Sequence, residues 1–502
     1  MAKKIIVIGT GPGGAASAML LAHRGFDVTV FEKSSTVGGR NGAIEAEGYK
    51  FDIGPTFLMM KFLLDSVFEE AGCRSEDYLK FTKLEPMYEL KTPRGSLKPS
   101  NDPEKTKQAI EALFPGRSAG FDRFMEVEKK RFSKIIPCLQ RDYSSFRSLL
   151  SLKLMMSFPY LSINRSVFGV LKSYFEEDDL ALLFSFQSKY LGMSAWKCPG
   201  GFSMLSYIEH AYGIYHTEGG LAQIPKALLK VAQEKGAKVR MSTPVKNLVL
   251  EGRKVVGVRL EDGSVERADA VFVNADFGHA VEKLVPEGAL KKYAPKNLDK
   301  KKVSCSTFMI HLGVDRMYPS EFHTIVFADD YKRNVQEIFE TNKLSWDTSF
   351  YVRNASILDP TLAPKGHSSL YVLVPVPNLE AGIDWKEIAP SYRDHVLSLV
   401  ERKMGFGDLR KHIRVERVVT PNDWNHRLSI YKGATFNLSH NLSQMAYWRP
   451  RNRFEEFDGC YLVGGGTHPG SGLPTILESA RISTNLLCRD LGVPFFTKEL
   501  VA

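Results

Sequence analysis

The chain has 502 residues, of which 43% are hydrophobic and 25% are charged, and its formal net charge at pH 7 is +10. This length is several times that of a typical domain, so we expect two or three structural units, and the composition excludes a disordered or fibrous chain. The positive charge suits nucleic acid, anionic lipid or an acidic ligand, and charge alone does not choose between them.

The cysteines and the first residues indicate where the protein works. The six cysteines form no CxxC pair and have no metal-ligand spacing, so we expect neither a disulfide framework nor a metal site. Scattered thiols suit a reducing cytoplasm. The apolar run at residues 5–8 is too short for a signal peptide, and no window of about 18 uncharged apolar residues indicates a transmembrane helix. These features predict a cytoplasmic protein.

The first thirty residues have the pattern of a strand, a glycine turn, a helix and a second strand. Residues 4–8 form a β-branched run suited to a buried parallel strand, and residues 27–31 predict the second strand. Between them, residues 15–24 are small and mostly apolar, as in a helix packed on a sheet, and Gly25 ends this helix.

The glycines of this turn have the spacing of a dinucleotide-binding loop. Gly9 permits the tight turn, Gly11 lets a pyrophosphate approach the backbone, and Gly14 allows the helix to pack closely on the strand. Glu32 follows Gly14 by 18 residues and can accept a hydrogen bond from an adenosine ribose hydroxyl. The pattern predicts a nucleotide site; the alternative is a glycine-rich turn that binds no nucleotide.

The residues after Glu32 favour FAD over NAD. Lys33 is followed by the run Val37-Gly38-Gly39-Arg40, where an NAD domain would continue into another crossover helix. The paired glycines bring backbone amides, and Arg40 a guanidinium, back to the phosphate side. The alternative places Arg40 on the solvated face of a loop.

A basic, partly apolar segment lies in the middle of the first half of the chain, after helices expected near residues 61–71 and 103–113. Residues 129–175 contain nine basic side chains and one acidic side chain, Asp142. Lysine and arginine attract anionic headgroups, and neighbouring apolar side chains can enter the interface. We expect this segment to lie on a membrane through Arg141, Arg147, Lys153, Leu154, Met155 and Phe158. The alternative is a solvated helical subdomain; no motif supports nucleic-acid binding.

Alternating helix and strand patterns return in the second half. A helix is expected at 221–235, and strands are expected at 238–241, 245–250, 255–260, 270–274, 304–312, 369–374 and 460–463. Because nucleotide-type elements lie at both ends and in the middle, we expect domains that are discontinuous in sequence.

The C-terminal segment 464–474 is a second glycine-rich turn between a strand and a helix, which is expected at about 475–487. The free amides and positive dipole end of such a helix suit the flavin N1–C2=O edge, where negative charge gathers on reduction. The cofactor contacts expected here are Gly465, Gly466, Thr467, Gly472, Leu473 and Pro474. The alternative is a structural loop.

The chain resembles the bacterial-type carotenoid desaturases, which include phytoene and diapophytoene desaturases and are similar to FAD-dependent amine oxidases. The matching segments are 9–40, 51–56, 218–220, 448–452 and 466–470. The resemblance implies an α/β fold: a Rossmann-like FAD-binding domain, a mixed-sheet substrate domain and a helical membrane-associating region. It also implies that hydride transfer to flavin converts C–C to C=C bonds in a C30 or C40 polyene. Trp448 and Arg451 depart from the family's commoner Phe and His, which bears on substrate selectivity.

The resemblance also implies the domain limits. The FAD-binding domain would combine residues 1–60, 215–285 and 455–502, the substrate domain residues 61–128 and 286–454, and the membrane-associating region residues 129–214. Further cofactor contacts are expected at Gly54, Pro55, Thr56 and, beside the adenine, Val245.

No catalytic residue is assigned from the sequence, because the developing cation is delocalised along the polyene. His216, His440 and His468 are interpreted as structural, with His468 holding the flavin turn. The expected partners are an apolar polyene, an anionic membrane on its cytoplasmic face, and a quinone or oxygen as electron acceptor. The alternatives are an oxygenase or isomerase of the same lineage, a protoporphyrinogen or amine oxidase, and a prenyl-lipid carrier of the GDP-dissociation-inhibitor type that lacks flavin chemistry.

Overall fold

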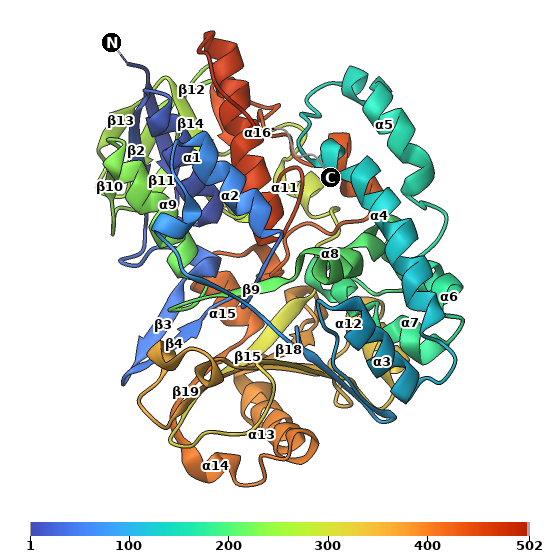
Figure 1. The fold of residues 1–502 in the computed structure, drawn as a ribbon. Helices are drawn as coiled ribbons and strands as arrows, with labels where there is room; N and C mark the ends of the chain where they lie inside the picture. The colour runs from blue at the N-terminus through green and yellow to red at the C-terminus, as the bar shows by residue number, and fades with distance from the viewer. Residues whose placement is uncertain (1, 499–502) are drawn as a thin grey trace.

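The computed structural model describes residues 2–498 of the chain. Figure 1 shows two sheet-based layers, one above the other, with a group of helices along one side of both. The first and last limits of the expected FAD-binding domain, residue 1 and residues 499–502, lie outside the described residues.

The upper layer is built on a five-stranded parallel sheet whose strands come from three distant parts of the chain. Its order is β10-β2-β1-β14-β20. The strands are β10 (Lys238–Arg240), β2 (Asp27–Phe31), β1 (Lys4–Ile8), β14 (Ala270–Val273) and β20 (Cys460–Leu462). The three parts correspond to the beginning, the middle and the end of the sequence, so this layer is discontinuous.

Both faces of this sheet are buried, and β1 shows how. Its side chains alternate, so that Ile5 and Val7 pack in one core and Ile6 and Ile8 in another. Helices cover the first face: α1 (Pro12–His23), α9 (Gln223–Glu234) and α16 (Leu473–Leu491). An antiparallel sheet covers the second: β11 (Val245–Glu251), β12 (Lys254–Leu260) and β13 (Val265–Arg267).

The lower layer is a seven-stranded mixed sheet in the order β19-β15-β18-β17-β16-β7-β8. The strands are β19 (Ile413–Val419), β15 (Ser306–Val314), β18 (Ser368–Val376), β17 (Phe350–Asn354), β16 (His323–Val326), β7 (Glu89–Thr92) and β8 (Gly95–Leu97). In β15, Phe308 and Ile310 pack with helix α13 (Trp385–Met404), while Thr307 and Met309 face a cavity between the layers. The period-2 alternation of the strand therefore divides structural from cavity-lining side chains.

The helical side of the molecule begins with α4 and has its own apolar core. Its helices are α4 (Ala119–Leu139), α5 (Leu152–Ser157), α6 (Val167–Phe175), α7 (Asp178–Leu183) and α8 (Met204–Tyr212). No helix among residues 2–498 has both the length and the apolar character needed to cross a membrane.

Shorter elements join these parts. The strands are β3 (Ala43–Ala46), β4 (Tyr49–Asp52), β5 (Leu58–Met59), β6 (Phe81–Lys83) and β9 (Ile214–Thr217). The helices are α2 (Lys61–Glu70), α3 (Pro103–Leu113), α10 (Phe277–His279), α11 (Pro295–Leu298), α12 (Tyr331–Phe339), α14 (Leu409–His412) and α15 (Pro421–His426).

Two helices of the structure pack across domain limits expected from the sequence. The limit between residues 128 and 129 falls inside α4, which begins at Ala119 and packs as one unit with α6 and α8. The limit after residue 60 separates α2 from the upper layer, yet Leu64, Val67 and Phe68 of this helix belong to the core of that layer. In both cases the apolar side chains of the helix pack in a core that extends across the expected limit. This packing is tertiary, so the order of residues along the chain does not reveal it.

Candidate functional site

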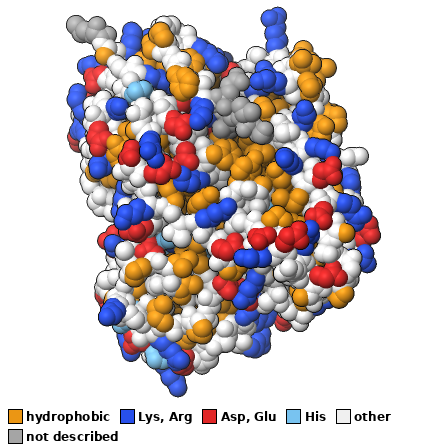
Figure 2. All heavy atoms as spheres, viewed as in Figure 1, with side chains coloured by type: hydrophobic (Ala, Val, Ile, Leu, Met, Phe, Trp, Pro, Cys, Tyr) orange, Lys and Arg blue, Asp and Glu red, His pale blue; other side chains and the backbone are white. Residues whose placement is uncertain are grey.

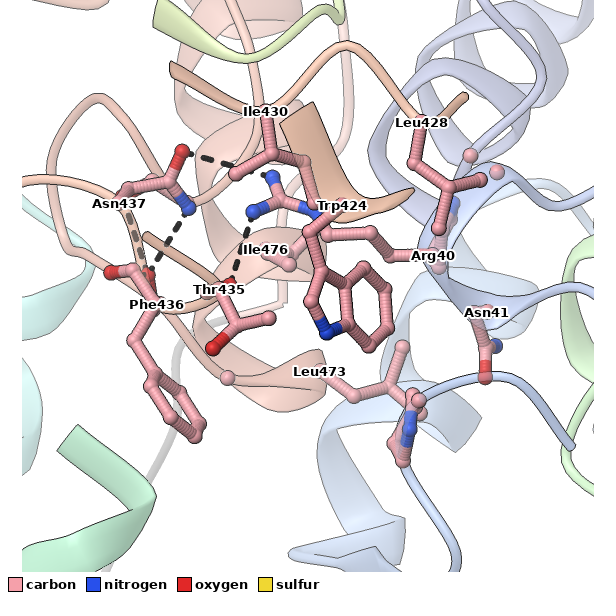
Figure 3. A pocket seen from close by; sticks show the side chains of 18 of the residues that line it. Arg40, Asn41, Trp424, Leu428, Ile430, Thr435, Phe436, Asn437, Leu473 and Ile476 are labelled. Atoms are coloured by element: carbon pink, nitrogen blue, oxygen red, sulfur yellow. Dashed lines mark hydrogen bonds between the residues drawn. The ribbon is translucent and has the colours of Figure 1, made fainter. Parts of the chain in front are cut away.

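A cavity of about 520 Å³ lies between the two layers, and the residues that line it come from segments between Ile8 and Ile476 that are far apart in the sequence. One end is formed by glycine turns of the parallel sheet. The other end is formed by apolar side chains of the lower sheet and the helical side. Figure 3 shows the junction of the two ends, where Arg40, Trp424, Asn437 and Leu473 point toward one another.

The first glycine turn fits closely against its surroundings. Gly9 has φ +94°, a conformation that side chains disfavour. A Cβ on Gly14 would lie 2.0 Å from the Gly9 carbonyl oxygen, so this glycine packs behind the loop and does not line the cavity. Gly9, Gly11 and Pro12, the first residue of α1, do line it. The free amides at the start of α1 therefore face the open space.

Glu32 is buried at the end of β2 and already accepts three hydrogen bonds. Its Oε2 accepts from the amide and the hydroxyl of Thr10, at 2.8 Å each, and its Oε1 accepts from the Ser34 amide at 2.9 Å. Oε1 keeps one free acceptor direction, and the residue lines the cavity beside Lys33 and Val245. Glu32 can thus hold its own loop and receive a ligand hydroxyl.

Arg40 places its guanidinium at the junction of the cavity. It donates to the Thr435 carbonyl at 3.0 Å and to the Asn437 side chain at 3.4 Å, and it lies 3.8 Å from Asp276 (Figure 3). Burial lowers the pKa of Arg40, and burial raises the pKa of Asp276. A guanidinium so placed provides a positive charge for the phosphate side of a nucleotide.

The C-terminal turn contributes only part of what the sequence suggested. Gly465, Gly472, Leu473 and Pro474 line the cavity, and Gly472, with φ +124°, is the N-cap of α16. Gly466 and Thr467 lie behind the wall. A Cβ on Gly466 would lie 2.5 Å from Phe277, and the Thr467 hydroxyl donates to the Pro450 carbonyl at 2.6 Å. These two residues support the turn.

The segment after β4 forms the floor between the two ends. Gly54, Pro55 and Thr56 line the cavity together with Gly39. The Tyr351 hydroxyl of β17 donates to Thr56 Oγ1 at 2.8 Å, which ties the segment to the lower sheet.

The three histidines named from the sequence have protein partners. His216 Nε2 bonds Asp359 at 2.7 Å, His440 Nε2 accepts from the Ser471 amide at 3.0 Å, and His468 Nε2 bonds the Leu139 carbonyl at 3.2 Å. The last two brace the C-terminal turn, and neither lines the cavity.

The second end of the cavity is mainly apolar. Its lining side chains are Phe57, Met59, Tyr88, Phe186, Tyr190, Ile325, Phe350 and Leu373. Such a wall excludes water and can bury a long hydrocarbon. No sequence pattern indicates this surface, because its residues come from six separate segments.

Three ionisable side chains near this end were also missed: Glu209 and His323 are buried, and Lys189 is half-buried. Burial lowers the pKa of Lys189 to about 7 and raises the pKa of Glu209 to about 7. Burial also holds the pKa of His323 well below its usual value. Lys189 and His323 line the cavity, and Glu209 accepts hydrogen bonds from Tyr88 and Gln187 behind it. No motif marks these residues in the sequence.

The geometry fits a flavin dinucleotide. Glycine backbone, two helix starts and Arg40 converge at one end of the cavity, and the adjoining space is open. At Gly39, which has φ +54°, a Cβ would meet no atom within 4 Å. Among residues 2–498 no group of three or more possible metal ligands lies together.

Comparison with known proteins agrees with this geometry. The family described as flavin containing amine oxidoreductase matches residues 13–487. A 4,4'-diapophytoene desaturase (4,4'-diapolycopene-forming) of Methylomonas sp is 49% identical over 98% of this chain and 96% of its own length. The chain belongs to this flavin oxidoreductase family, in its carotenoid desaturase branch.

A second relative and a solved structure extend the comparison. An all-trans-zeta-carotene desaturase of Myxococcus xanthus is 35% identical over 98% of this chain and 94% of its own length. An oxidoreductase of Methanosarcina mazei has the same fold, with a TM-score of 0.62, 18% identity, and coverage of 95% of this chain and 99% of that one. The likeness to this solved structure concerns the fold alone.

Proposed function

We propose that the protein is an FAD-dependent desaturase of a C30 polyene of the diapophytoene type. The observation that carries this is one continuous cavity with a glycine-lined, Arg40-bearing end and an apolar end. The relative at 49% identity is named for a C30 substrate, whereas the Myxococcus relative at 35% is named for a C40 one, which supports the shorter chain.

The residues of this chain would divide the work as follows. Gly9, Gly11 and the start of α1 would hold the pyrophosphate, Glu32 a ribose hydroxyl, and the start of α16 the flavin edge on which charge gathers. A bound flavin supplies the hydride acceptor. The apolar wall would orient the polyene and exclude water, and a quinone or oxygen would restore the oxidised cofactor.

Pigment analysis tests the substrate. The protein is co-expressed with a C30 or a C40 polyene synthase, and the extracted pigments are separated by chromatography with absorbance detection. We expect coloured, more conjugated products from the C30 precursor. Products from the C40 precursor alone would contradict the proposed chain length, and oxygenated products without new double bonds would favour the oxygenase of the same lineage.

We further propose that the segment around α5 binds the membrane that stores the polyene. Leu152 is 72% exposed, Met155 61% and Phe158 57%, although large apolar side chains are usually buried. Figure 2 shows hydrophobic side chains gathered at the upper right, over the region of α5, with lysine and arginine side chains beside them. Arg147 and Lys153 are exposed there, while Arg141 and Leu154 are half-buried.

The positive charge of this segment is smaller than the sequence suggested. Arg131 is buried in an ion pair with Glu128 at 2.9 Å, Lys130 pairs with Glu126 at 2.7 Å, and Lys172 pairs with Asp178 at 2.7 Å. The exposed apolar side chains therefore carry more of the proposed membrane contact than the count of basic residues implied.

A further inference from the structure

Lys189 is a lysine in an unusual place. It lies in the short 3-10 helix η5 (Phe186–Leu191), and its side chain lines the cavity next to the apolar wall. Among residues 2–498 no carboxylate contributes to the shift of its pKa, which burial dominates. A charged ammonium without a counter-ion is costly to bury, so a purely structural role would be better filled by an apolar side chain.

The hydrogen bonds leave the amine lone pair free. Lys189 Nζ donates to the Ser349 hydroxyl, and this hydroxyl in turn donates to Asn334 Oδ1 at 2.9 Å. Because the hydrogen of Ser349 is committed to Asn334, Ser349 can only accept from the amine. The Lys189 side chain lines the cavity, and its Nζ lies 4.5 Å from the centroid of the Tyr331 ring.

The groups that face Lys189 are uncharged near neutral pH. Burial raises the pKa of Cys305 to about 12, and it raises the pKa of Tyr331 and of Tyr190 above the usual value. Burial lowers the pKa of Lys189 itself to about 7. Much of the amine is therefore neutral under physiological conditions, and a neutral amine is a competent proton acceptor.

Lys189 also lies close to the junction with the flavin end. Cys305 interacts electrostatically with Lys189. The Cys305 carbonyl accepts a hydrogen bond from Thr435 Oγ1 at 3.4 Å. The Thr435 carbonyl accepts from Arg40 at 3.0 Å. Lys189, Cys305, Thr435 and Arg40 all line the same cavity.

We propose that Lys189 is the base that takes the proton from the polyene during desaturation. This rests on the proposed function. One carbon of a CH–CH pair loses hydrogen with its electron pair to the flavin, which is the oxidant. The adjacent C–H bond breaks, its electron pair forms the new π bond, and the proton bonds to the lone pair of Lys189 Nζ. A neutral amine also avoids repelling the positive charge that develops on the polyene.

The first test measures the amine itself and not turnover. The flavin-loaded protein is treated with cyanate, which reacts with neutral amines, from about pH 5.5 to about pH 9.5, and the modified lysines are mapped by mass spectrometry. We expect the modification of Lys189 to level off with a midpoint near its lowered pKa of about 7. Exposed Lys332 on α12 is the internal control, and its modification should still rise at the highest pH. A bound polyene should protect Lys189 alone.

A rate for Lys189 that rises like that of Lys332 would contradict the proposal, because the amine would then be charged at neutral pH. Absence of modification at every pH would contradict it too, since an amine that faces the cavity must be reachable from it.

The second test removes the base. Lys189→Met should bind flavin and polyene as the parent does, because it places an apolar side chain in a buried position, but its anaerobic flavin reduction by polyene should be slower by a factor of about 10² to 10⁴. In the parent, the rate of flavin reduction should fall as the pH drops through about 7, the pKa of Lys189. This acidic limb of the pH–rate profile should be absent in the variant. Lys332→Met is the matched control and should behave as the parent.

Glu209 also titrates near pH 7, so Glu209→Gln tests the alternative origin of the limb. We expect the limb to persist in this variant; its loss there, with Lys189→Met unchanged, would assign it to Glu209 and overturn the proposal. Lys189→Gln and Lys189→Arg serve if the Met variant fails to fold. If no polyene reduces the flavin of the parent, the proposed function fails, while the cyanate titration still decides the state of Lys189.

Discussion

Glu32 illustrates how one side chain can serve both the fold and the site. Its carboxylate accepts from the Thr10 amide, the Thr10 hydroxyl and the Ser34 amide, so it fixes the glycine loop to the end of β2. It also lines the cavity, with one acceptor direction unused. The spacing pattern identified the residue but not the hydrogen bonds that orient it.

We predict that Glu32→Ala weakens FAD binding by about 1.5–3 kcal/mol, the range for hydrogen bonds to a charged group. Loosening of the loop through Thr10 adds to the loss of the ribose contact. Titration of apoprotein with FAD, followed by quenching of flavin fluorescence, measures the effect. Asp27→Ala, at the half-buried start of the same strand, is the control and should bind FAD as the parent does, because Asp27 does not line the cavity. Unchanged affinity in Glu32→Ala would show that Glu32 does not contact the cofactor.

At the scale of elements, α5 is distinguished by large apolar side chains that remain exposed to solvent. Its six residues Leu152–Ser157 leave Leu152, Met155 and Met156 more than half exposed, and Phe158 follows directly. Exposure of these apolar side chains to water is unfavourable in free energy. This unfavourable contribution is removed when the side chains enter a lipid interface.

We predict that Arg141→Glu, Arg147→Glu and Lys153→Glu together release the protein from anionic liposomes and slow the turnover of liposome-embedded polyene. The new acidic groups repel the headgroups, and parent binding should weaken, without vanishing, as salt screens the charges within a Debye length of about 8 Å. Co-sedimentation measures binding, and the flavin spectrum should be unaffected.

A second variant separates the contribution of apolar insertion to liposome binding from the contribution of charge. Leu152→Ser with Met155→Ser keeps the charges and should lower the binding that remains at high salt. If the triple charge variant sediments with anionic liposomes as the parent does, the segment is a solvated face and the membrane contact lies elsewhere.

At the scale of the whole molecule, the cofactor end of the cavity is assembled from segments near residues 9–56, 245–276 and 464–476. A ligand that bridges these segments binds only the folded chain, and so it stabilises the folded state by mass action.

We predict that FAD at 100 times its Kd raises the free energy of unfolding of the apoprotein by about 2.7 kcal/mol. For a chain of this size the shift in Tm should be about 3 °C. Differential scanning calorimetry at one scan rate compares FAD with NAD, which should have no effect. A shift with NAD and none with FAD would contradict the assignment of the cofactor.

The sequence alone determined the main elements of the parallel-sheet layer. Residues 4–8 and 27–31 form strands with the predicted bounds, and the expected helix at 221–235 is present as Gln223–Glu234. The two strand predictions succeed because the glycine spacing, the β-branched runs and Glu32 all lie within a short stretch whose geometry is local.

Only the tertiary structure decided the rest of the site. Lys189, Ser349 and Asn334 are joined by hydrogen bonds across about 160 residues, and the apolar wall gathers side chains from six segments. Whether Gly466 lines a cavity or packs behind one depends on Phe277, a contact that no spacing rule contains. Burial is set by the packing of distant segments, and burial is what lowers the pKa of Lys189 to about 7, so the state of this amine is a property of the fold.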